Sequence, residues 1–200
     1  MKAEKVVELS SVPIEVKRRF PEGARITLCH GVFDLLHPGH IHHFKEAKAA
    51  GDFLVVTVTS DRYVNKGPGR PYLTAESRAL ILSSLEVVDL VAISDFPDAL
   101  EALKIVRPNV YAKGPDYVDS NQDLTGKISK EGELCATLGG RIIFTSGPTM
   151  SSSSLRNEMI MRDPGDFSEW LPLFRSAIGE EDVSRPVSYT HLRAHETGRN

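Results

Sequence analysis

The chain has 200 residues, a formal net charge of −3 and 40% hydrophobic residues, enough to bury one sizeable core. We expect a single domain with tails, and the slightly acidic balance argues against nucleic acid as a partner. The sequence shows neither a membrane-length apolar run nor a signal-peptide pattern, so we expect no membrane partner. Its two cysteines, Cys29 and Cys135, lie in apolar sequence, which is typical of a reduced pair in a cytoplasmic protein.

Short apolar runs alternate with helical patterns from residue 25 onward, as in a parallel α/β sheet. We predict strands at residues 26–29, 53–59, 90–93, 110–112 and 141–145. We predict helices at residues 14–20, 40–50, 75–86, 97–106, 127–138 and 152–161, with Thr74 as the N-cap of the third. The weak polar alternation of the strands suits a sheet covered on both faces. Right-handed crossovers then give a Rossmann-like, doubly wound parallel sheet of about five strands, with ligands at the carboxyl ends of the strands.

The predicted organisation has four parts. Residues 1–24 form an N-terminal helical segment on the rim, residues 25–161 form the α/β domain, and residues 162–186 form a linker or the start of a further domain. Residues 187–200 differ in composition and resemble the translated read-through of a sequencing adaptor, so we expect a non-native tail there. His191 and His195 are therefore excluded from the site.

The segment after the first predicted strand carries the most chemistry. Gly31 has no Cβ, which lets a phosphate approach the backbone closely. Pro38 and Gly39 suit the entry into a helix whose first N–H groups bind anions. His37 and His40 are three residues apart, so we expect both to reach one phosphate and to stabilise charge that develops on it.

A metal cluster is the alternative for these histidines, because His43 continues the helical spacing and His42 lies beside it. However, no cysteine or carboxylate stands at zinc-ligand spacing, and Asp34 precedes the helix. We therefore expect phosphate chemistry and no metal site.

The ten residues 31–40, GVFDLLHPGH, resemble the signature of the cytidylyltransferase-like nucleotidyltransferase superfamily. The resemblance spans residues 25–157 and is nearest to the adenylyltransferase domain of bacterial ADP-heptose synthase. It implies that His37 and His40 are catalytic and contact the nucleotide phosphates. The other residues that it places at the nucleotide are Gly31, Val32, Phe33, Asp34 and Gly39.

Three further segments support this resemblance. Lys113, expected to be catalytic, follows the fourth predicted strand in a Lys-Gly-Pro-Asp-Tyr run that is similar to the heptose enzyme's, with Gly114 and Asp116 bordering the base. The basic loop after the second strand and the helix behind it supply cations for substrate or triphosphate oxygens: Lys66, Arg70 and Arg78. The hydroxyl run before the last predicted helix offers donors to the triphosphate: Ser151, Ser152 and Ser153.

The resemblance implies transfer of a nucleotidyl group, AMP preferred, from ATP to a phosphorylated sugar, with Mg²⁺ as cofactor and pyrophosphate as product. A CTP-dependent enzyme that acts on glycerol 3-phosphate or another alcohol phosphate is the alternative, although Ser146-Gly147-Pro148 stands where that enzyme has an arginine. A nucleotide-binding regulatory module is the non-enzymatic alternative. The resemblance also implies a homodimer and a fused sugar-kinase-like domain.

Overall fold

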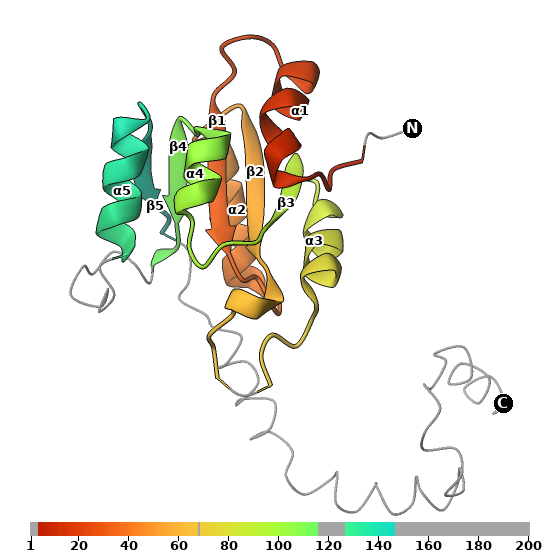
Figure 1. Cartoon of the computed structure of the whole chain (residues 1–200). Coiled ribbons are helices and arrows are strands. Elements are labelled where there is room, and N and C mark those ends of the chain that lie inside the picture. The colour runs from red at the N-terminus through yellow and green to blue at the C-terminus, as the bar shows by residue number, and fades with distance from the viewer. Residues whose placement is uncertain (1–3, 68, 116–126, 147–200) are drawn as a thin grey trace, which may run out of the picture. The chain divides into compact units, whose positions relative to one another are not determined.

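The computed structural model describes residues 4–67, 69–115 and 127–146, which belong to a compact unit of residues 1–152. Five parallel strands form one sheet in the order β3-β2-β1-β4-β5 (Figure 1). The strands are β1 (Ile26–Gly31), β2 (Phe53–Thr59), β3 (Leu90–Ser94), β4 (Val110–Lys113) and β5 (Arg141–Phe144). The predicted doubly wound, Rossmann-like α/β sheet is therefore confirmed.

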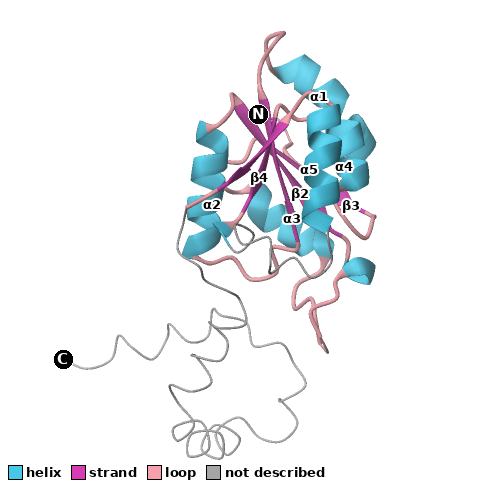
Figure 2. Cartoon of the chain, turned by 90° about the vertical axis from the view of Figure 1, so that its left-hand side faces the viewer, coloured by secondary structure: helices cyan, strands magenta, loops and turns pink. Residues whose placement is uncertain are grey.

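Helices cover both faces of the sheet (Figure 2). The α-helices are α1 (Val12–Arg19), α2 (Pro38–Ala49), α3 (Ala75–Ser83), α4 (Leu100–Val106) and α5 (Lys127–Thr137), and the 3-10 helices are η1 (Leu9–Ser11) and η2 (Asp61–Tyr63). One apolar cluster joins the sheet to η1, α1, α4 and α5, and the other joins it to α2 and α3. The predicted helix at residues 152–161 lies outside the described residues.

Strand β2 shows why its sequence lacks a polar face. All seven of its residues are buried, and successive side chains enter opposite clusters: Phe53 and Val55 face the α4 side, whereas Leu54 and Val56 face the α2 side. A strand in the middle of a covered sheet has no solvent face, so an unbroken apolar run is what such a position requires.

The helix ends follow local side-chain chemistry. Thr74 caps α3, because its hydroxyl accepts the Ser77 N–H at 3.3 Å, as predicted. Helix α4 begins at Leu100, three residues later than predicted. There the Asp98 carboxylate accepts the Leu100 N–H at 3.0 Å, which satisfies a backbone donor at the helix start.

The predicted N-terminal helix is present as α1, but this segment is part of the core and does not lie on the rim. Residues 5–7 pair with Val91 at the edge of the sheet. Val12 is fully buried, and the Phe20 ring stacks on Phe53 with 4.1 Å between centroids. Apolar side chains at these positions complete the face that β2 and β3 would otherwise expose to water.

The strand order places a topological switch point between β1 and β4, the neighbouring strands from which the chain winds in opposite directions. Loops beyond the carboxyl ends of these strands therefore meet, which brings residues 32–40 close to Lys113 and Gly114. Within the part of the chain that the structure describes, every helix is too short or too polar to traverse a lipid bilayer.

Candidate active site

The two predicted catalytic histidines lie together at the amino end of α2. His37 is the N-cap, in an extended conformation with φ −142°, and Pro38 opens the helix. The rings of His37 and His40 are 3.8 Å apart between centroids and inclined by 30°. The pair thus stands where unsatisfied N–H groups and the helix dipole attract an anion.

His40 is held as a neutral ring. Burial, followed by the neighbouring His37, His43 and Lys66, lowers the pKa of His40 to about 3. Its Nδ1 is buried and has no hydrogen-bond partner among the described residues. At neutral pH the ring carries a single N–H.

The turn before the helix is built around Phe33. This residue adopts φ 50°, in the left-handed region that residues other than glycine rarely adopt. Its ring lies edge-on to the His40 ring, with 5.5 Å between the ring centroids. A Cβ at Gly31 would lie 3.0 Å from the Phe33 ring. The absence of a Cβ at Gly31 therefore makes room for the Phe33 ring of the same loop. From the sequence we predicted instead that this glycine allows the close approach of a phosphate.

Asp34 acts as an anchor for the loop before α3. Its carboxylate is 1% exposed and accepts the N–H groups of Tyr72 (2.8 Å) and Leu73 (3.0 Å) and the Arg70 Nη1 (2.7 Å). Burial alone would raise the pKa of the Asp34 carboxyl, but these donors together hold it below its usual value. Because its oxygens are occupied, Asp34 shapes the loop instead of presenting a free carboxylate to a nucleotide.

Arg78 joins three loops from a fully buried position. Its guanidinium donates to the backbone oxygens of Leu73 (2.9 Å), Val32 and Thr59 (2.8 Å), and to the Asp61 carboxylate (2.6 Å). We predicted from the sequence that Arg78 holds substrate or triphosphate oxygens. In the structure its donors face protein oxygens, because backbone carbonyls from three loops converge on them.

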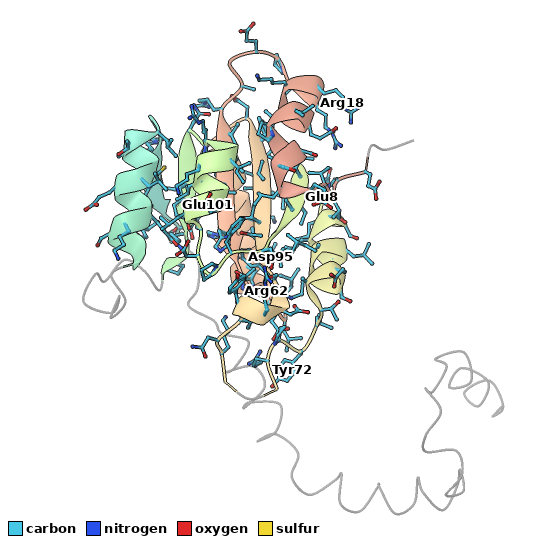
Figure 3. All side chains as sticks on the ribbon, in the orientation of Figure 1. Glu8, Arg18, Arg62, Tyr72, Asp95 and Glu101 are labelled. Carbon is cyan, nitrogen blue, oxygen red and sulfur yellow. The ribbon has the colours of Figure 1, made fainter. Side chains whose placement is uncertain are left out.

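The other two predicted cations differ in exposure. Lys66 lies on the exposed part of the loop, and its charge helps to lower the pKa of His40. The Arg70 side chain is 4% exposed, pairs with Asp34 and lies over the Tyr72 ring at 4.1 Å. Tyr72 marks this loop below the sheet (Figure 3). Arg70 therefore belongs to the anchor of the loop, and Lys66 is the more accessible of the two.

Lys113 enters the switch point from β4. Its ammonium pairs with Glu131 of α5 at 2.8 Å, and the same carboxylate oxygen accepts the Tyr111 hydroxyl at 2.8 Å. Both members of the ion pair are almost fully buried. The backbone at the next residue, Gly114, is open, since a Cβ there would meet nothing within 4 Å.

Sequence reasoning missed His30, the last residue before Gly31. Its Nδ1 lies 2.9 Å from the Thr57 hydroxyl and its Nε2 lies 3.4 Å from that of Thr59. Burial, with Lys113 nearby, lowers the pKa of His30 to about 3. Its position at the carboxyl end of β1 was the one signal in the sequence that could have placed His30 in the site. Its hydrogen-bond partners lie on β2 and could not be identified from the sequence around His30.

Four predicted residues lie outside the described part of the chain: Asp116, Ser151, Ser152 and Ser153. The structure does not test their roles. Among the described residues, no three His, Cys, Asp or Glu side chains are placed to hold a metal ion. Asp34 and Glu131 already accept bonds from protein donors, so the described residues do not fit a resident Mg²⁺ of the protein's own.

The sequence profile of the family described as cytidylyltransferase-like matches residues 28–158. The chain is 40% identical over 119 residues to "Bifunctional protein HldE" of Methylobacillus flagellatus, covering 58% of this chain and 24% of that protein. It is 36% identical over 140 residues to the protein of the same name from Wolinella succinogenes, covering 69% and 29%. The chain thus spans about a quarter of the length of the curated relatives it matches.

Solved structures agree with the fold. The lipopolysaccharide core biosynthesis protein from Thermoplasma volcanium is 29% identical, with a TM-score of 0.53 over 64% of this chain and 100% of that one. Pantoate-beta-alanine ligase from Francisella tularensis, complexed with "Beta-gamma ATP and Beta-alanine", is 17% identical, with a TM-score of 0.52 over 76% of this chain and 69% of that one. This second likeness concerns the fold alone.

Proposed function

Since the chain belongs to the cytidylyltransferase-like family, we propose that it transfers a nucleotidyl group, preferably AMP from ATP, to a sugar phosphate, as in ADP-heptose synthesis. A phosphate oxygen of the acceptor attacks the α-phosphorus of the nucleotide. The bond between that phosphorus and the bridging oxygen breaks, and pyrophosphate leaves with the electron pair. The protein needs no covalent intermediate, so its task is to hold two anions in line and to offset their repulsion.

The observation that carries the proposal is the His37–His40 pair at the amino end of α2, beside the switch point. Helix N–H groups favour an anion there. The N–H of neutral His40 is a donor for the α-phosphate oxygens in the transition state, where a positioned donor is most effective. Lys113 supplies positive charge from β4, on the other side of the switch point.

Loop residues complete the proposed site. Asp34 and Arg78 fix the loops around it, and Lys66 is the accessible cation for an incoming anion. Gly114 and Asp116 border the base, and the hydroxyl run at residues 151–153 holds the triphosphate tail. Mg²⁺ enters with the triphosphate as part of the substrate, because the described residues offer no carboxylate set of their own.

The relatives support the choice of acceptor. Their names contain "bifunctional", and a structural relative is named for lipopolysaccharide core biosynthesis. The first name indicates two activities in one protein, and the second indicates the synthesis of a saccharide, which suits an enzyme that activates a sugar phosphate. In this proposal the second activity is kinase-like. A homodimer is part of the same proposal.

The test is pyrophosphate release by the full chain. Mg²⁺ is combined with each of ATP, CTP, GTP and UTP and with heptose 1-phosphate, other sugar 1-phosphates or glycerol 3-phosphate. His42→Ala, at an exposed position of the same helix, serves as the matched control for His40→Ala. Release with ATP and a sugar 1-phosphate, lost only in His40→Ala, supports the proposal. Release only with CTP and glycerol 3-phosphate identifies the alternative enzyme, and nucleotide binding without release identifies a regulatory module.

A further inference from the structure

The third histidine of α2 has a partner far along the chain. His43 follows His40 by one helical turn and is 8% exposed. Its Nδ1 lies 2.9 Å from the hydroxyl of Thr145, directly after β5. Burial, followed by the Lys113 charge, lowers the pKa of His43 to about 4. The ring is therefore neutral at pH 7 and carries one N–H.

The neighbours of Thr145 define where that N–H is. The Thr145 hydroxyl has one proton, which it donates to the backbone oxygen of Lys113 at 3.2 Å. The Thr145 N–H donates to the same oxygen at 2.9 Å. With its proton directed at Lys113, the hydroxyl accepts from His43, and we infer from this arrangement that the proton of His43 is on Nδ1. A chain of hydrogen bonds runs from α2 through Thr145 to the backbone of Lys113.

A second link from the same helix reaches the next residue. Glu46, one turn beyond His43 on α2, accepts both the N–H of Ser146 at 2.7 Å and its hydroxyl at 2.8 Å. Two consecutive residues after β5 are therefore bonded to α2. Helix α2 also rests on the sheet through apolar side chains such as Phe44 and Ala47, and its far end is held by the ion pair between Lys48 and Asp89 at 2.5 Å. Apolar contacts are not directional, whereas hydrogen bonds weaken steeply when distorted.

We propose that His43 is a positioning residue, which sets α2, and with it His37 and His40, against the backbone of Lys113 through Thr145. This role rests on the proposed function. His43 contacts no reacting group in this scheme; it fixes the separation of the two sides of the site. A displacement of about 1 Å in such a site costs on the order of 100-fold in rate.

The experiment compares four variants in the full chain. His43→Leu removes the donor and Thr145→Val removes the acceptor, while the volume of each side chain is roughly kept. His43→Asn puts an amide N–H close to the position of Nδ1, and Thr145→Ser keeps the hydroxyl. His42→Leu is the matched control, because His42 is exposed on the same helix. The readouts are kcat and KM for nucleotide and acceptor, with the ring ¹⁵N spectrum of the wild type for the tautomer.

We expect kcat to fall about 10- to 100-fold in His43→Leu and in Thr145→Val, with KM changed far less. The double variant should be no worse than either single one, since both break the same link. His43→Asn and Thr145→Ser should recover most of the loss, and His42→Leu should match the wild type. The wild-type spectrum should show the proton on Nδ1.

Three results would overturn the inference. The first is an active wild type whose His43→Leu variant keeps its kcat. The second is additive losses in the double variant, and the third is a wild-type ring protonated on Nε2. A wild type that releases no pyrophosphate with any substrate pair refutes the proposed function and this role with it. That outcome is distinguishable from a wild type that releases pyrophosphate and keeps its kcat when His43 is replaced, which refutes the role of His43 alone.

Discussion

Replacing Arg78 by methionine tests whether this side chain holds loops or ligand. The substitution removes a fully buried guanidinium and leaves three backbone oxygens without their donor, those of Val32, Leu73 and Thr59. The fourth acceptor, Asp61, is 43% exposed, so water can replace its partner at little cost.

The size of the effect follows from these acceptors. Each buried carbonyl deprived of a donor costs about 1–3 kcal/mol. Loop relaxation recovers part of the sum over three carbonyls, so we expect a loss of about 3–5 kcal/mol. Arg78→Lys keeps the charge but not the planar fork, and should lose about half as much.

Urea unfolding of the full chain measures this loss as the free energy of unfolding. The matched control is Arg62→Met, because Arg62 is 62% exposed and pairs with Asp95 at the surface (Figure 3). That change should stay within about 0.5 kcal/mol. The opposite result is a free energy of unfolding for Arg78→Met within about 1 kcal/mol of the wild type, together with a higher KM for the nucleotide. In that case Arg78 binds ligand and does not hold the loops.

Three further changes probe the same loops and the strand beside them. Asp34→Asn should lower the free energy of unfolding by about 1.5–3 kcal/mol at pH 7. Because the folded pKa of Asp34 lies below its usual value, the stability that its carboxylate contributes is present above about pH 4 and is lost as the pH falls further. An equal loss in the variant at pH 7 and at pH 3, measured by urea titration, would contradict this prediction. Gly31→Ala brings a Cβ within 3.0 Å of the Phe33 ring and should cost about 1–3 kcal/mol, whereas Gly114→Ala should leave the melting temperature nearly unchanged; equal shifts would be evidence against this packing. The pKa of His30 falls to about 3 on folding, so its neutral ring stabilises the fold above about pH 6.5 and less as the pH falls. His30→Asn should therefore flatten the pH dependence of unfolding between about pH 6.5 and 4.5, and an unchanged slope would exclude this cause.

The sheet could be predicted because its signal is local. A strand covered on both faces needs an unbroken apolar run, and residues 53–59 give β2 with its observed bounds. Residues 5–7 were missed, because a single bridge to Val91 leaves no periodic pattern. The inward packing of Val12 and Phe20 likewise depends on a sheet face that no local window contains.

The site was predicted only as far as its motif reaches. His37 and His40 lie within four consecutive residues, and the helix that brings their rings together begins between them at Pro38. Apart from the nearby Leu73, the partners of Asp34 and Arg78 lie 17 to 46 residues away along the chain. The partner of His43 lies 102 residues away. Such pairs depend on the strand order, which gives no signal at either residue. The catalytic and binding roles of these residues stay predictions.

The measurement that tests the central claim most directly is pyrophosphate release from Mg–ATP and a sugar 1-phosphate by the wild type and by His40→Ala. We predict acceptor-dependent release by the wild type. We predict a kcat lower by about 100- to 1000-fold in the variant, which is about 3–4 kcal/mol of lost transition-state stabilisation, with unchanged unfolding. Equal release by both proteins, or tight nucleotide binding without release by either, would contradict the claim that the His37–His40 pair carries out nucleotidyl transfer.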